Sequence, residues 1–158
     1  MKIPKTWTPI SKESCQKLNC KYAYNKTVDN KVFSIIVYMV GDADERFFDT
    51  AKKGLDAIKE ENLLVDGNPN DKNYENTAIV MPLVYGDIVI NKERAFLNLS
   101  NYLVADNKYQ TICQIMFNKD GKLYNIQFTT KDYNLSNAQE EFRKDPLFIE
   151  VLEYIRIN

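Results

Sequence analysis

The segment that decides the fold is Ile115-Met116-Phe117-Asn118-Lys119-Asp120-Gly121-Lys122-Leu123-Tyr124. Asp120 and Gly121 tolerate the left-handed backbone dihedrals that a tight turn requires. Apolar runs on both sides of this pair are typical of a β-hairpin. The segment therefore predicts a hairpin that joins strand 109–117 to strand 122–130.

The two predicted strands differ in how apolar residues are distributed over their faces. In strand 122–130 apolar and polar residues alternate, which indicates one buried and one wet face. Its buried side chains are expected to be Tyr124, Ile126 and Phe128. In strand 109–117 one face carries Cys113, Ile115 and Phe117, and the opposite face carries Ile112 and Met116. A strand that is apolar on both faces is expected near the centre of its sheet.

Further strands are predicted on both sides of a central helix. A firm strand runs from Val32 to Val40 after the turn residues Asp29-Asn30-Lys31, and it should lie inside the sheet because both of its faces are apolar. Strands are also expected at 77–84, 86–91 and 93–104, separated by turns at Tyr85-Gly86-Asp87 and Ile90-Asn91-Lys92-Glu93. Short extended segments are expected at 3–9 and 21–24, and Pro82 marks a bulge or an edge.

Two helical regions complete the expected fold. The first spans 45–60, is capped by Asp42 or Asp44, and ends near 61–62. Its apolar stripe comprises Phe47, Ala51, Leu55 and Ile58. Near the C-terminus Ser136 and Gln139 fit a capping box, and Asp145-Pro146 is typical of a new helix start. The stripe of that last helix comprises Phe148, Val151, Leu152 and Ile155. The fold class is therefore α+β, an antiparallel sheet flanked by helices.

Length and composition favour one domain over residues 1–158. The chain has 158 residues, is 44% hydrophobic and 27% charged, and carries a formal net charge of −1. The scattered Lys and Arg residues give no basic patch, which argues against nucleic-acid binding. The longest apolar run, Phe33 to Gly41, has the length of a strand, so no transmembrane segment is expected.

The N-terminus and the cysteines leave the compartment open. Met1-Lys2-Ile3-Pro4 is followed by no apolar signal region, so either the protein is cytoplasmic or a signal or lipid-anchor segment has been removed, giving a periplasmic or membrane-anchored protein. Cys15 and Cys20 lie five positions apart, a spacing that permits a disulfide without requiring one. Cys113 falls on a predicted strand and is expected to be buried.

The residue types that carry common chemistries are sparse. There are no histidines, three dispersed cysteines and five scattered glycines. We therefore expect no imidazole-based catalysis, no four-thiolate metal site, no phosphate-binding glycine loop and no cofactor, and we predict that the protein is not an enzyme. The segment Asp66–Asp71 begins like a calcium loop, but Asp71 and Thr77 stand where Gly and the bidentate Glu are needed. It is interpreted as a solvated loop.

Aromatic side chains give the remaining hint of function. Tyr and Trp are favoured at protein interfaces because they combine a large apolar area with a polar tip. Six of them are expected at strand ends or in loops, where each can pack in the core or face a partner: Trp7, Tyr74, Tyr85, Tyr102, Tyr109 and Tyr133.

Several segments together resemble a known family. They are the opening Ile3-Pro4-Lys5-Thr6-Trp7, the strand Phe33–Val40 with its following helix, Val89–Ala95, Gly121–Thr130, Phe142, and the closing Phe148–Ile157. These segments are similar to the PsbP-like fold family, which includes the extrinsic oxygen-evolving subunit of photosystem II, a Ran-binding nuclear import factor and many bacterial lipoproteins. The chain departs from the family pattern at Lys92-Glu93, where glycine is usual. The resemblance implies an α/β/α sandwich and mostly non-enzymatic, accessory or binding roles.

Two classes of function are therefore expected. The first is a non-catalytic module, monomeric or homodimeric, that binds another protein through a sheet face or loop rim. This class includes an exported or lipoprotein-type accessory protein and an immunity or inhibitor protein. The alternative is a small-ligand carrier with a pocket between sheet and helix, which an apolar cavity of several hundred cubic ångströms would favour.

Overall fold

The computed structural model describes residues 6–65, 80–105, 108–134 and 136–157. The N-terminal half contains β1 (Thr8–Pro9), α1 (Lys12–Lys17), β2 (Tyr22–Val28), β3 (Lys31–Asp42) and α2 (Arg46–Val65). The next strands are β4 (Val80–Ile90), β5 (Glu93–Ala105), β6 (Lys108–Lys119) and β7 (Lys122–Thr129). The chain then forms α4 (Ala138–Glu141), a 3₁₀ turn (Phe142–Lys144) and α5 (Pro146–Ile157).

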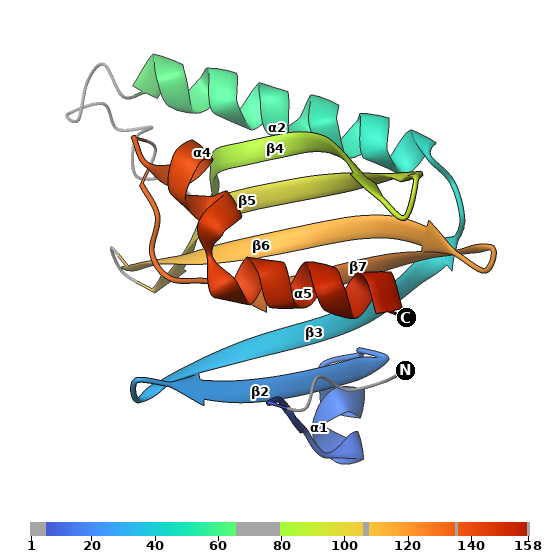
Figure 1. Ribbon diagram of the computed structural model, residues 1–158. Coiled ribbons are helices and arrows are strands. Elements are labelled where there is room, and N and C mark those ends of the chain that lie inside the picture. The colour runs from blue at the N-terminus through green and yellow to red at the C-terminus, as the bar shows by residue number, and fades with distance from the viewer. Residues whose placement is uncertain (1–5, 66–79, 106–107, 135, 158) are drawn as a thin grey trace.

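The strands of the described residues form one seven-stranded sheet in the order β1-β2-β3-β7-β6-β5-β4. Every neighbouring pair is antiparallel. After the β2–β3 hairpin, α2 carries the chain to the opposite edge, and β4 to β7 return strand by strand until β7 pairs with β3 (Figure 1). The α+β class is thus confirmed, as is the inner position of strands β3 and β6.

Three hairpins use the same two-residue turn. Both central residues have positive φ in Asp29-Asn30 (49° and 61°), Asn91-Lys92 (53° and 68°) and Asp120-Gly121 (51° and 74°). Such turns match the right-handed twist of paired strands, and Asn, Asp and Gly tolerate the conformation best. The three turns expected at these positions are confirmed.

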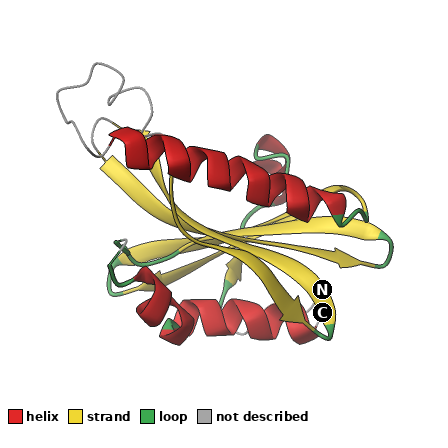
Figure 2. Ribbon diagram, turned by 90° about the horizontal axis from the view of Figure 1, so that it is seen from above, coloured by secondary structure: helices red, strands yellow, loops and turns green. Residues whose placement is uncertain are grey.

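The two faces of the sheet are covered differently (Figure 2). On one face α5 packs over a large apolar core, and Phe148, Val151, Tyr154 and Ile155 of this helix are buried. The strand residues beneath it include Ile35, Val37, Cys113, Ile115, Ile126 and Phe128. On the other face α2 lies against β4 and closes a smaller cluster, which consists of Phe48, Leu55, Phe96 and Leu123.

The structure corrects the prediction of two strands before β5. Residues 80–90 form a single strand, and Tyr85, Gly86 and Asp87 pair with Asn98, Leu97 and Phe96 without a turn. Gly86 continues the strand with a φ of 148°, a conformation that side chains rarely allow. The register shifts instead between Pro82 and Val84, so the predicted bulge at Pro82 on an edge strand is confirmed.

Three helix predictions are also corrected, and one helix was not predicted. The prediction of Asp44 as a cap of α2 holds, because its side chain accepts a hydrogen bond from Arg46 N at 3.0 Å. The predicted apolar stripe is wrong at one position, because Phe47 is 47% exposed and Phe48 is fully buried instead. The helix continues to Val65 instead of ending near 61–62. The expected capping box at Ser136 is wrong, because Asn134 Oδ1 accepts the Ser136 hydroxyl at 2.6 Å and α4 begins only at Ala138. Helix α1 had no predicted counterpart, since it buries no side chain and so leaves no apolar stripe.

The last helix follows its sequence signals. Asp145 Oδ1 accepts a hydrogen bond from Leu147 N at 2.9 Å, and Pro146 is the first helical residue. Proline suits this position because its missing N–H would have no partner in the first turn. None of the described helices is long and apolar enough to cross a membrane. The segment 66–71, which resembles the start of a calcium loop, lies outside the described residues.

Candidate functional site

Three carboxamide side chains lie in one line across the α2 side of the sheet. Asn98 of β5 pairs with Gln114 of β6, and Gln114 pairs with Gln127 of β7. Because directly paired residues of antiparallel strands point to the same face, the three side chains are neighbours there. We refer to Asn98, Gln114 and Gln127 as the amide row.

Hydrogen bonds run along the amide row in one direction. Asn98 Nδ2 donates to Gln114 Oε1 at 3.0 Å, and Gln114 Nε2 donates to Gln127 Oε1 at 3.4 Å. Gln127 Nε2 donates to none of the residues that the structure describes. The row therefore ends in a carboxamide N–H pair that is available to an external acceptor.

The inner end of the amide row is held rigidly. Asn98 is 5% exposed, and its Oδ1 accepts the hydroxyl of fully buried Ser100 at 2.6 Å. The same Asn98 Nδ2 donates to the Tyr102 hydroxyl at 3.1 Å, and that hydroxyl donates to Gln114 Oε1 at 3.3 Å. A buried carboxamide with satisfied partners has little freedom, so it fixes the direction of the whole row.

The outer end of the row opens onto a partly exposed region of the same face. Ile36 of β3 pairs with Gln127, and Tyr38 pairs with Asn125 of β7. These four residues and Gln114 are all partly exposed. We call Ile36, Tyr38, Gln114, Asn125 and Gln127 the open face. It carries hydrogen-bonding amides and apolar surface but no formal charge.

One acceptor on the open face has no hydrogen-bond partner among the described residues. Asn125 Oδ1 is buried and accepts no hydrogen bond from them, and the same holds for Asn118 Oδ1 on the same side of β6. Buried polar atoms are nearly always paired, and an unpaired one costs free energy. The described part of the chain thus satisfies these polar side chains incompletely.

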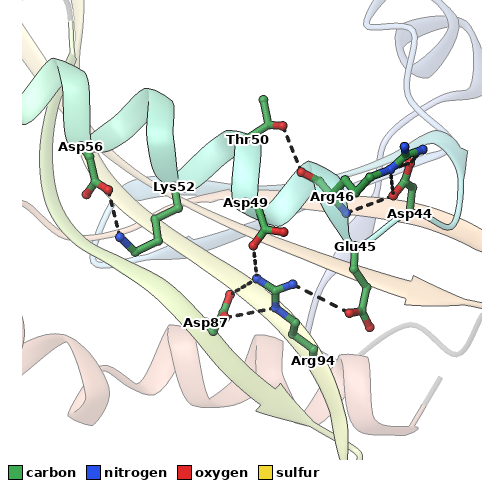
Figure 3. A network of polar contacts seen from close by, with 9 residues as sticks. All are labelled: Asp44, Glu45, Arg46, Asp49, Thr50, Lys52, Asp56, Asp87 and Arg94. Carbon is green, nitrogen blue, oxygen red and sulfur yellow. Dashed lines mark hydrogen bonds and ion pairs between the residues drawn. The ribbon is translucent and has the colours of Figure 1, made fainter.

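An ionic cluster fastens the beginning of α2 beside this region (Figure 3). Arg94 donates through Nη2 to Asp49 at 2.7 Å and through Nε to Asp87 at 3.0 Å, and its Nη1 lies 3.8 Å from Glu45. The hydrogen bonds to Asp49 and Asp87 raise the pKa of Arg94. The guanidinium also lies 5.4 Å from the Phe48 ring centre, which joins the ionic cluster to the small apolar core.

A second polar contact joins the middle of α2 to β4. Tyr85 donates its hydroxyl to Asp56 at 2.5 Å, and Lys52 donates to the other oxygen of the same carboxylate at 2.9 Å. Burial and this hydrogen bond raise the pKa of Tyr85 to about 12. The expected interface residue Tyr85 is therefore engaged within the chain.

The carboxyl groups behave as ion-pair partners. Hydrogen bonds from Lys122, Arg46 and Tyr85 lower the pKa values of Asp42, Asp44 and Asp56, respectively. Burial favours the neutral form of Glu150, but hydrogen bonds from Lys26 (2.8 Å) and Thr6 (2.6 Å) outweigh it and lower its pKa. Within the described ranges no three His, Cys, Asp or Glu side chains are placed to hold a metal ion.

The six aromatic candidates do not form one patch. Trp7 and Tyr133 lie in the α5-side core, 5% and 4% exposed. Tyr133 donates its hydroxyl to buried Asp145 at 2.7 Å. Tyr85 and Tyr102 lie on the other face, and each is bonded to another side chain there.

The other two aromatic candidates are Tyr74 and Tyr109. Tyr74 lies outside the described residues. The backbone of Tyr109 pairs with Leu103 near the start of β6, and its side chain is not among those described. The expectation that these six residues face a partner stays a prediction. Tyr102 contacts the amide row through its hydrogen bonds with Asn98 and Gln114.

Surface depressions occur at the rim of the sheet. One of about 300 Å³ lies between the turns 91–92 and 120–121 and the end of α5, and one of about 290 Å³ lies between α2, β4 and α4. Polar and charged side chains make up most of both linings. Under α5, Val37, Leu99, Cys113, Ile115 and Ile126 have no exposed area.

The amide row was missed by sequence reasoning, although part of its signal was present. The turn at Asp120-Gly121 pairs residues equally distant from it, such as Lys119 with Lys122. Gln114 lies five residues before the first and Gln127 five after the second, so the predicted hairpin already places them side by side. The partner Asn98 was not predictable in the same way, because the register between β5 and β6 shifts between Leu103 and Ala105.

Comparison of the sequence with family models and with curated proteins finds no match. The site is therefore interpreted from its own geometry.

Proposed function

We propose that the protein is a non-catalytic binding module that recognises another protein through the open face, on an α/β/α sandwich of the PsbP-like type. The observation that carries the proposal is the directed hydrogen bonding of the amide row, which ends at Gln127 in donors that no other described residue accepts. A partner that offers backbone or side-chain carbonyl oxygens would accept these hydrogen bonds. Ile36 and Tyr38 beside them supply apolar contact area.

The pKa values of the carboxyl groups support a binding role over catalysis. A carboxyl group that acts as a general acid near neutral pH needs a raised pKa. Among the described residues, the carboxyl groups with a clear change are Asp42, Asp44, Asp56 and Glu150, and the pKa of each is lowered. A lowered pKa is typical of carboxylates that accept hydrogen bonds from cations or hydroxyl groups.

The core supports protein binding over ligand transport. A carrier needs an apolar cavity, and the space between the sheet and α5 is occupied by side chains without exposed area. The depressions at the rim of about 300 Å³ are lined mainly by polar and charged groups. A small-ligand carrier therefore stays the second hypothesis. An immunity or inhibitor protein is a narrower form of the first hypothesis, a module that binds another protein.

The test is affinity purification from the native host with three forms of the immobilised chain. They are the wild type, the double variant Gln114→Ala/Gln127→Ala, and Glu153→Ala as a control on the exposed side of α5. We expect one protein to co-elute with the wild type and with Glu153→Ala, and its yield to drop about tenfold with the double variant.

Salt provides a second criterion in the same experiment. Because the open face carries no formal charge, the specific partner should stay bound at about 1 M NaCl, where exposed ion pairs are screened. Equal recovery of the partner with all three forms would contradict recognition through the open face. Release of the partner by salt would contradict it as well.

A further inference from the structure

Helix α1 ends in a motif that brings two specific side chains together. Its last helical residue is Lys17, Leu18 caps it, and Asn19 has a φ of 52°. Asn19 N donates to Gln16 O at 3.0 Å, and Cys20 N donates to Cys15 O at 3.1 Å. These are the two hydrogen bonds of a Schellman motif, in which the side chains of the outermost pair contact each other.

In this chain both members of that outermost pair are cysteines. The hydrogen bond from Cys20 N to Cys15 O brings their Cα atoms near the separation that a disulfide spans, about 4.4–6.8 Å. Cys15 Sγ itself lies 3.1 Å from Cys20 O. Burial, followed by a hydrogen bond with the Cys15 thiol, raises the pKa of Cys20 to about 12.

We propose that Cys15 and Cys20 are a reversible redox site, at which a small-molecule disulfide such as oxidised glutathione converts the two thiols into an intramolecular disulfide. One of the two cysteine sulfurs, as a thiolate, attacks one sulfur of the small disulfide and releases one small thiol. The other cysteine sulfur then attacks the mixed disulfide, forms the Cys15–Cys20 bond and releases the second small thiol. Two hydrogens leave the protein, and the small disulfide takes them up as two thiols.

Either thiol can take the first step, because both belong to the same C-terminal motif of α1. Once one cysteine carries the mixed disulfide, the neighbouring cysteine reacts within the same molecule, where its effective concentration is high. The mixed disulfide should therefore not accumulate.

Oxidation of the pair would stiffen one border of the open face. Helix α1 has no buried side chain, and hydrogen bonds on either side of it join this segment to the sheet, from Ile10 N to Ala23 O at 3.0 Å and from Lys21 N to Val37 O at 2.8 Å. The second bond places Cys20 close to Tyr38 of the open face, because each is the chain neighbour of a bonded residue. The disulfide would hold α1 in place next to Tyr38.

The experiment compares the purified full chain after incubation with reduced or with oxidised glutathione. The wild type and Cys113→Ala should each lose about 2 Da and two of their titratable thiols on oxidation, and dithiothreitol should restore both. Cys113→Ala is the matched control because Cys113 is buried on β6 and lies apart from the pair. Cys15→Ser and Cys20→Ser should not show the loss of about 2 Da.

Trypsin digestion locates the bond. Cleavage after Lys17 separates the two cysteines, so peptides Glu13–Lys17 and Leu18–Lys21 should travel as one linked species only in the oxidised sample. Retention of all three thiols, stable attachment of glutathione to Cys15 in the wild type, or links between two chains would each overturn the proposal.

Discussion

Arg94 joins the start of α2 to β4 and β5 through ionic contacts. It contacts acidic side chains from the start of α2 and from β4, and it lies over the Phe48 ring. Its side chain is 28% exposed, whereas those of its acidic partners are 52–62% exposed. One cation therefore neutralises part of a group of three carboxylates.

Replacing Arg94 with Met should lower the urea midpoint of unfolding. The change leaves Glu45, Asp49 and Asp87 facing one another without a shared cation, so repulsion adds to the lost hydrogen bonds. Lys52→Met is the control, because it removes one exposed pair within α2. The difference between the variants should shrink at about 1 M NaCl, since salt screens exposed charges. Equal midpoints at low salt would contradict the role given to Arg94.

Glu150 should make stability depend on pH in the acid range. Its folded-state pKa lies below the ordinary value of 4.5, so the ion pair with Lys26 contributes fully above about pH 4.5. The contribution is lost as the pH falls through the lower, folded-state pKa. Urea unfolding of Glu150→Gln from pH 7 to pH 3 should therefore show a flatter acid branch than that of the wild type. The control Glu153→Gln, on the exposed side of α5, should follow the wild type.

At the scale of elements, local signals decided where prediction succeeded. The turns at Asp29-Asn30, Asn91-Lys92 and Asp120-Gly121 were predictable because few residue types tolerate positive φ. The single strand β4 was not predictable, because glycine signals a turn and also permits the unusual strand conformation that Gly86 adopts. Contacts between distant segments carry no such local signal.

The rotation of α2 illustrates the same limit. The spacing of apolar residues predicted a stripe through Phe47, but Phe48 is the buried residue. Both positions are aromatic, so periodicity alone cannot choose between them. The choice follows from contacts of Phe48 with Phe96 of β5, where the ring centres lie 6.5 Å apart.

The adjacent phenylalanines provide a matched test of this helix orientation. Phe48→Ala should destabilise the protein by about 3–5 kcal/mol, because it removes a fully buried ring and leaves a cavity. Phe47→Ala should cost less than about 1 kcal/mol, because that side chain is largely exposed. Denaturant unfolding of both variants measures the difference. Similar losses, or the reverse order, would show that α2 is rotated from the orientation described.

At the scale of the whole molecule, the two faces of the sheet are unequal. The α5 side is closed by a continuous apolar core, and the α2 side is covered over β4 and leaves polar amides partly exposed on β6 and β7. The alternation of apolar and polar residues in strand 122–130 predicted that one face of this strand would be exposed to water. It did not predict that Asn98, Gln114 and Gln127 would align, since that alignment needs the register of three strands.

Binding of another protein at the open face is the central claim, and site-specific photo-crosslinking in the native host tests it most directly. A benzophenone amino acid is placed at Ile36 or Tyr38, and at Glu153 on the exposed side of α5 as the control. We predict that positions 36 and 38 both crosslink to the same protein and that position 153 does not. Crosslinks to that protein from position 153 alone, or none from positions 36 and 38, would contradict the proposed function.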